Sequence, residues 1–190
     1  GRIFDDLEED KDQYNDVIEV FWATGACLFV RASHFWEVGG LDEDFFAHQE
    51  EIDLCWRLKN NGYKVMVNPK SMVHHVGGGT LDAGSPFKTY LNFRNNLFML
   101  FKNLPLPSLF IVIPLRLFLD AVAAITFFKQ EKGLLHVLAI VKAHFYFYFA
   151  IPSLTVKRMK IKQKNNLLAK MNYSILLENK LKGIRNFSDL

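Results

Sequence analysis

Residues 39–58 of the sequence, GGLDEDFFAHQEEIDLCWRL, hold its densest group of polar side chains and lead directly into an expected helix. We expect that helix to run from about residue 49 to residue 60, because Gly62 lies just past its end, where a left-handed backbone is least strained. One face of the helix should be buried, since four side chains recur on it at helical spacing. They are Glu51, Leu54, Cys55 and Leu58.

Glu51 heads this buried face in the first turn of the expected helix. Burial raises the pKa of a carboxyl group there, while the helix N-terminus favours its charged form. A carboxylate in such a place is a candidate general base, and Glu50 is its acidic neighbour. Asp53 and Arg57 stand four residues apart and are expected to form a supporting ion pair. The alternative is an acidic helix start that the helix dipole favours without any chemistry.

The N-terminal flank begins with an acidic stretch, residues 5–16, that is expected to be a solvated loop. β-branched and aromatic runs then predict buried strands over 17–22 and 26–30. Ser33 is a candidate N-cap for a short helix, which Gly39-Gly40 would end.

On the C-terminal side of the polar segment, alternation predicts strands over 63–67 and 72–76. Ser85-Pro86 then opens an expected helix over 87–102. Proline stands at its first position, where a missing N–H is harmless.

Two long apolar segments follow, over 109–128 and 134–151. Their lengths suit a hairpin through the bilayer, but internal charges are expensive in hydrocarbon, so helices lying in the interface fit as well. A helical subdomain packed on the globular part is the third alternative. Arg116 and Asp120 are four apart and can pair on one helix face. The basic run after the second segment would attract anionic cytoplasmic headgroups. It comprises Lys157, Arg158, Lys160, Lys162 and Lys164.

The composition excludes several classes of protein. Of the 190 residues, 50% are hydrophobic and 23% charged, which excludes a disordered chain and a collagen-like fibre. Two cysteines, Cys27 and Cys55, are too few for a disulfide framework and suit a reducing compartment. Residues 1–60 carry 5 Lys or Arg against 15 Asp or Glu, whereas residues 61–190 carry 18 against 5. The resulting net charges of −10 and +13 indicate two surfaces that face different partners.

Further candidate polar groups lie after the expected strands. His74-His75 precede Gly77-Gly78-Gly79, and only one histidine of a strand pair can face a given site. Glycines let the backbone approach a ligand closely, and their N–H groups can cradle phosphate oxygens. A structural histidine and a flexible turn are the alternatives. The next helix carries a polar stripe that could hold a diphosphate or a sugar, or face solvent. The stripe and its basic neighbour are Lys88, Asn92, Asn95 and Arg94.

These blocks together resemble the C-terminal half of a family 2 glycosyltransferase, an inverting enzyme with the GT-A fold. The similarity is closest to the bacterial rhamnosyltransferase-like branch that builds surface polysaccharide, and it covers residues 22 to about 103. Five ordered blocks at the family's spacing carry it: 24–27, 38–46, 50–57, 73–81 and 88–97.

The resemblance implies an α/β fold and three regions. Residues 1–104 would be the C-terminal, acceptor-side portion of a GT-A catalytic domain. Residues 105–164 would be apolar, membrane-associated helices, and residues 165–190 a basic tail. The family's nucleotide-binding half, with its Asp-x-Asp metal motif, is expected upstream, so we expect these 190 residues alone to be catalytically silent.

The resemblance also implies roles for single residues. In the family an acidic pair opens the helix, and its second member deprotonates the acceptor hydroxyl, which makes Glu51 the base and Glu50 its partner. Glu stands here where Asp is commoner. The family's histidine before the glycines helps hold the metal or the diphosphate, and His75 matches it better than His74. The implied substrate contacts are Gly39, Gly40, Asp42 and Trp22, with Lys88 and Arg94 for the leaving diphosphate.

The implied reaction is a single displacement from a nucleoside-diphosphate sugar to a hydroxyl of a lipid-linked or polysaccharide acceptor. It would take place in the cytoplasm at the inner face of the plasma membrane, with Mg²⁺ or Mn²⁺ held mainly by ligands upstream. One alternative is a non-catalytic, membrane-associated binding or scaffold module of the same fold. A nucleic-acid binder is disfavoured, because the basic residues flank apolar runs.

Overall fold

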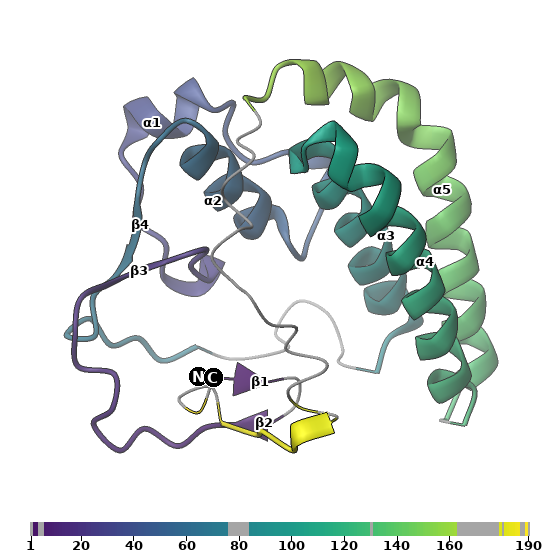
Figure 1. Cartoon of the computed structure of the whole chain (residues 1–190), viewed down its shortest axis with the longest axis horizontal. Helices are drawn as coiled ribbons and strands as arrows, with labels where there is room; N and C mark the ends of the chain where they lie inside the picture. Colours follow the sequence, from purple (N-terminus) through teal and green to yellow (C-terminus); the bar gives the residue numbers. More distant parts are fainter. Residues whose placement is uncertain are drawn as a thin grey trace.

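The computed structural model describes residues 2–3, 6–75, 84–129, 131–162, 179, 181–186 and 189 of the chain. Within these ranges it is mainly helical (Figure 1). The helices are α1 (Ala32–Glu37), α2 (Glu50–Asn60), α3 (Pro86–Asn103), α4 (Leu106–Phe128) and α5 (Gly133–Met159), with short 3-10 turns η1 (Gly25–Cys27) and η2 (Glu43–Phe45). Two antiparallel strand pairs accompany them: β1 (Arg2–Ile3) with β2 (Asp6–Leu7), and β3 (Ile18–Val20) with β4 (Val65–Val67).

The expected α/β character is limited, in the described part, to two small two-stranded sheets, of which the β3–β4 sheet lies beside α2. Ile18 pairs with Val67 and Val20 with Val65 in this sheet. Val65 is buried, whereas Met66 and Val67 are exposed. The sheet therefore covers one side of α2 and leaves apolar side chains of its own on the surface.

The helices around the polar segment begin and end where their capping residues predict. Gly62, with φ of +93°, follows the end of α2. Ser85 caps α3 by accepting the N–H of Phe87 at 3.2 Å, and Pro86 is the first helical residue. These two helices are confirmed, as is α4, which starts slightly before residue 109. α5 is longer than expected, because it continues through Pro152 into the basic run.

Three local expectations are wrong. Residues 26–30 are not a strand, because residues 25–27 form η1, in which Thr24 Oγ1 accepts the N–H of Ala26 at 3.4 Å. This local bond competes with the ladder that the β-branched sequence would otherwise favour. Residues 71–75 are exposed coil without a strand partner. Helix α1 begins at Ala32, so Arg31 and not Ser33 precedes its first turn.

Helix α3 lies at the centre of the helical layer (Figure 1). It packs against α2 on one side and against α4 and α5 on the other. The main core forms where these helices meet, and aromatic side chains dominate it. Its buried members include Phe45, Trp56, Leu97, Phe98, Leu104, Phe147 and Leu154.

A buried ionic network ties this core to the polar segment. Asp53 is fully buried on α2 and pairs with Arg57 at 2.8 Å, as its spacing predicts. The same carboxylate pairs with Lys102 of α3 at 3.0 Å and accepts the side-chain N–H of Asn103 at 2.8 Å. A carboxylate removed from water is tolerated only with such partners, so the pairing fixes α2 against α3.

Asp42 extends the network to α5. Its carboxylate pairs with Lys102 at 2.6 Å and with Lys157 at 2.5 Å. Burial alone would raise the pKa of Asp42, but the two lysines lower it to about 2. Lys157 also pairs with Asp44 at 2.6 Å, and Arg158 donates to the carbonyl of Phe101 at the same distance. The expectation that the basic run binds anionic headgroups is therefore wrong for its first two members, whose side chains bind the globular part instead.

Replacing Asp53 with Asn should lower the free energy of unfolding by about 3–5 kcal/mol, because Arg57 would stay buried without a carboxylate partner and Lys102 would keep only Asp42. Asp44→Asn is the matched control, since Asp44 is half exposed and its loss should change stability by less than about 1 kcal/mol. Thermal unfolding of the purified protein measures both variants. Equal melting temperatures for Asp53→Asn and the parent protein would contradict this account of the network.

Candidate functional site

The backbone before α2 is unusual. Phe46, His48 and Gln49 have φ angles of +62°, +70° and +71°, a region that residues other than glycine rarely occupy. Each such residue is strained by about 1–3 kcal/mol and persists only where surrounding contacts hold it. The start of α2, which carries Glu50 and Glu51, thus depends on a strained loop and on what holds that loop.

Two neighbouring residues of α3 hold the loop. Asn95 is fully buried and directs its side-chain amide at the carbonyls of Phe45, Ala47 and His48, at 2.8–2.9 Å. Arg94 donates to the carbonyls of Asp44 at 2.7 Å and Phe45 at 3.1 Å. Arg94, which the sequence suggests as a partner of the leaving diphosphate, thus donates its hydrogen bonds to backbone carbonyls. Asn95, which the sequence indicates only as part of a polar stripe, is a positioning residue.

Glu51 lies half-buried at the start of α2, packed against η1. A Cβ atom built on Gly25 would lie 3.8 Å from Glu51 Cβ, so the two segments are in van der Waals contact. Burial raises the pKa of Glu51, and the charge of Glu50 adds to the rise. The N–H groups of Glu51, Ile52 and Gly25 act in the opposite direction by stabilising the charged form. The carboxyl group is therefore more basic than an exposed one and still anchored, as a general base requires.

Several buried polar atoms of the loop before α2, of the first turn of α2 and of α3 have no hydrogen-bond partner among the described residues. Glu51 Oε2 and Glu50 Oε2 are buried and have no hydrogen-bond partner among the described residues. The same holds for His48 Nε2 and Asn96 Oδ1, and Gln49 links the two helices by donating to the carbonyl of Asn92 at 3.1 Å. Buried polar groups are ordinarily paired, so this group of atoms is suited to a polar ligand or to water.

His48 lies within electrostatic reach of Lys88, another candidate from the sequence. Burial lowers the pKa of His48, and the positive charge of Lys88 lowers it further, against the opposing effect of Glu50. A neutral imidazole is therefore favoured there at neutral pH. His48 was missed by sequence reasoning because nothing in its spacing distinguishes it from a loop residue.

The Gly39-Gly40 turn is held from inside the protein. The two glycines have φ angles of +85° and +65°, and Arg57 donates to the carbonyls of Val38 and Gly40 at 2.5 and 2.7 Å. A Cβ atom at Gly40 would lie 3.1 Å from Phe35 Cε1, so a larger residue there would displace the ring. Asp42, expected to line the acceptor side, points instead into the ionic network with Lys102.

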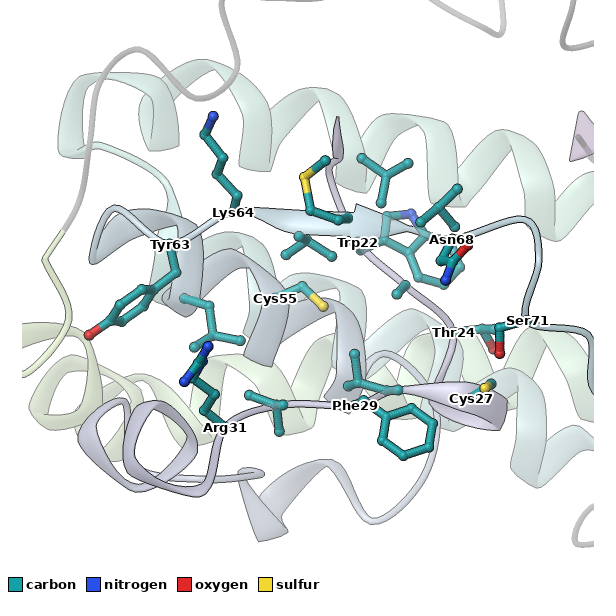
Figure 2. A pocket seen from close by; sticks show the side chains of 18 of the residues that line it. Trp22, Thr24, Cys27, Phe29, Arg31, Cys55, Tyr63, Lys64, Asn68 and Ser71 are labelled. Carbon is teal, nitrogen blue, oxygen red and sulfur yellow. The ribbon is translucent and has the colours of Figure 1, made fainter. Parts of the chain in front are cut away.

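A groove of about 1080 Å³ lies beside this region (Figure 2). Its lining is mixed, with aromatic and thioether side chains next to basic and hydroxyl groups. Thr24 and Cys27 contribute to the lining, and they flank Gly25, which touches Glu51. Trp22, a predicted substrate contact, also lines the groove and is 43% exposed. Other lining residues are Phe29, Arg31, His34, Tyr63, Lys64 and Met72.

His75, the predicted metal or diphosphate ligand, is exposed in the coil 71–75. The glycines at 77–79 lie outside the described residues. Across the described part of the chain, no group of three His, Cys, Asp or Glu side chains is arranged to hold a metal ion.

Comparisons with known proteins place the chain near enzymes that transfer sugars. It is 42% identical over 62 residues to the N-acetylglucosaminyl-diphospho-decaprenol L-rhamnosyltransferase of Mycobacterium tuberculosis, which is 32% of this chain and 20% of that protein. It is 39% identical over 56 residues to the rhamnosyltransferase WbbL of Escherichia coli K12, 30% of this chain and 21% of that protein. It is 30% identical over 74 residues to the low-salt glycan biosynthesis hexosyltransferase Agl10 of Haloferax volcanii. These residues are 38% of this chain and 24% of that protein.

The matches cover only about a fifth to a quarter of the length of these relatives. No family model matches the chain, and no solved structure matches it. The similarity therefore defines a glycosyltransferase-like relationship over about a third of the chain.

Asn95→Ala should release the loop before α2, because the carbonyls of Ala47 and His48 would lose the Asn95 donor and that of Phe45 would keep Arg94 without Asn95. The expected loss of stability is about 1–3 kcal/mol, the usual effect of leaving buried acceptors unpaired. In Asn95→Ala, hydrogen–deuterium exchange of residues 44–51 should accelerate. Asn92→Ala should leave this exchange unchanged, because Asn92 binds Gln49 through its backbone carbonyl, which the substitution keeps. Unaltered exchange in Asn95→Ala would mean that other contacts hold the loop.

Proposed function

We propose that the chain is the acceptor-side part of an inverting glycosyltransferase of family 2 with the GT-A fold, its nucleotide-binding half lying outside these 190 residues. Similarity to two rhamnosyltransferases and a hexosyltransferase supports the sugar-transfer class. The observation that carries the catalytic proposal is the half-buried Glu51, whose pKa is raised and whose Oε2 has no partner among the described residues. A scaffold module would have no need of such an unpaired carboxylate.

In this proposal Glu51 accepts the proton of the acceptor hydroxyl group. The freed oxygen attacks the anomeric carbon of the donor sugar, and the bond from that carbon to the diphosphate oxygen breaks with its electron pair. A single displacement of this kind inverts the anomeric configuration. Glu50 contributes by keeping the pKa of Glu51 high, and Arg57 contributes by holding the Gly39-Gly40 turn that borders the acceptor.

We propose a lipid-linked or polysaccharide acceptor, and a hexosyl or rhamnosyl donor in the form of a nucleoside-diphosphate sugar. The name of the mycobacterial relative gives its acceptor as a diphospho-decaprenol and its sugar as L-rhamnose. Helices α4 and α5 are long and apolar enough to enter a membrane, which is where a polyprenyl acceptor resides. The proposed location is the cytoplasmic face of the plasma membrane, and the product a cell-surface glycan.

A divalent Mg²⁺ or Mn²⁺ ion is part of the proposal, with its main ligands outside this chain. Among the described residues no group of three His, Cys, Asp or Glu side chains is arranged to hold the ion, and His75 is exposed. No step assigned here to Glu51 depends on the ion.

Glu51→Gln in the full-length enzyme should lower kcat by about 10²–10⁴-fold, because an amide cannot accept the acceptor proton. Glu51→Asp should retain measurable activity, since a carboxylate remains, and the exposed Glu43→Gln should behave as the parent enzyme. Transfer of labelled sugar from a panel of nucleoside-diphosphate sugars to N-acetylglucosaminyl-diphospho-polyprenol measures all three. Wild-type turnover in Glu51→Gln would refute the assignment of the base.

The pH dependence of kcat/KM should report the same carboxyl group. Activity requires the charged form, so it should fall on acidification through a pKa that burial and Glu50 hold above the usual value of 4.5. Glu50→Gln removes one neighbouring negative charge and should move this acid limb to lower pH. An acid limb that stays in place, or moves to higher pH, would show that another group titrates.

A further inference from the structure

The outer surface formed by α4 and α5 is almost entirely apolar. None of the exposed side chains of α4 is charged, and Lys142 is the one exposed charged side chain of α5. Both helices are long and apolar enough to cross a bilayer, and most of α4 is not covered by the protein. The exposed apolar side chains of this surface, which we call the hairpin face, include Phe110, Ile111, Phe118, Ile125, Phe145 and Phe149.

The carboxylate and imidazole side chains of the two helices, and Arg116 of α4, are buried or partly buried. Asp120 is 1% exposed and pairs with Arg116 at 2.6 Å and with His144 at 3.0 Å. His136 is buried against α3, with Nδ1 2.8 Å from the hydroxyl of Thr89. Lys142 places its ammonium group 5.0 Å from the centre of the Tyr90 ring of α3. The hairpin face is therefore separated from the polar interior along both helices.

The hairpin is attached to the globular part along its whole length. Contacts between α3 and α5 run from Thr89 and His136 at one end to Phe101 and Arg158 at the other, and the two helices lie side by side (Figure 1). α3 also carries Arg94, Asn95 and Lys102, which are buried among carbonyls and carboxylates of the polar segment. A hairpin that crossed the bilayer would therefore draw the charged Arg94 and Lys102 of α3 into hydrocarbon, which is strongly unfavourable.

Basic residues stand at both ends of the hairpin. Lys129 and Lys132 are exposed in the turn between α4 and α5, and Lys160 and Lys162 are exposed after α5. In a spanning hairpin the turn and the C-terminal end would lie on opposite sides of the membrane. Lysines near membrane helices are favoured on the cytoplasmic side and disfavoured on the other. Positive charge at both ends is thus expected when both ends lie on the same, anionic surface.

The turn itself makes the hairpin a fixed unit. Lys132 has a left-handed backbone with φ of +58°, and a Cβ atom on Gly133 would lie only 2.5 Å from the carbonyl oxygen of Phe127. Only glycine fits there, so α4 and α5 fold back on each other closely. The two helices then present one continuous apolar surface.

We propose that α4 and α5 lie in the plane of an anionic membrane leaflet, with the hairpin face in the acyl region and α3 on the aqueous side, and do not span the bilayer. This inference rests on the membrane association proposed above and adds its geometry. It sets α2 and Glu51 on the aqueous side of α3, at a fixed height over the headgroups, where the diphosphate of a polyprenyl-linked acceptor would lie.

Cysteine labelling in sealed right-side-out vesicles tests the geometry on the full-length protein. Glu131→Cys reports the turn and Lys162→Cys the C-terminal end, each against the labelling of the parent protein. With a membrane-impermeant maleimide, both positions should stay unreactive until the vesicles are permeabilised. Labelling of the turn alone before permeabilisation would show a spanning hairpin and overturn the proposal.

Flotation with liposomes tests separately whether an anionic membrane binds the hairpin face. Phe118→Glu and Phe145→Glu should each lower binding to vesicles of phosphatidylcholine and phosphatidylglycerol at least tenfold, whereas Phe29→Glu, which changes a still more exposed phenyl ring in the groove, should not. Lys160→Gln should lower binding about fivefold, and added salt should weaken that contribution.

If Phe145→Glu converts a dimer to a monomer without affecting flotation, a second copy covers the hairpin face and the proposal fails. A parent protein that does not float would refute the membrane association itself, while activity of Glu51 variants would still test sugar transfer.

Discussion

The buried carboxylate of Asp53 is the interaction on which the rest of the structure depends. Through Arg57 it fixes the Gly39-Gly40 turn, through Lys102 and Asn103 it fixes α3, and through Asp42 and Lys157 the same network reaches the end of α5. Such a group is stable only when each charge has its partner, since an isolated charge in a low-dielectric interior is strongly unfavourable. The acidic N-terminal part and the basic C-terminal part of the chain are thus complementary in the folded protein.

A second constraint acts at the start of α2, where strain and unpaired polar atoms coincide. Asn95 holds the backbone carbonyls of Phe45, Ala47 and His48, and Glu51 lies half-buried beside Gly25 at the end of this loop. Strained backbone and orphaned polar atoms are features that proteins retain where a ligand is bound. The groove lined by Trp22 and Thr24 offers space next to this point.

Much of this arrangement could be predicted from the sequence, and the part that could not has physical reasons. Helical periodicity and capping residues predict α2, α3 and the Asp53–Arg57 pair, because these depend on neighbours within one helix. Arg94 and Asn95 stand next to Asn92 in a polar run, and only the position of Asn95 between Leu91 and Phe98 on one helical face indicates burial. The engagement of Lys157 by Asp42 joins residues 115 apart, and no local pattern could show it. The η1 turn could not be predicted, because the β-branched and aromatic residues around it favour a strand.

The proposed function requires that the Glu51 carboxylate contact the acceptor hydroxyl group. A structure of the full-length enzyme with a lipid-linked acceptor sugar measures that contact directly. The account predicts one carboxylate oxygen of Glu51 at about 2.6–3.2 Å from the acceptor hydroxyl. A Glu51 side chain that points to bulk solvent, with another carboxylate on that hydroxyl, would contradict it.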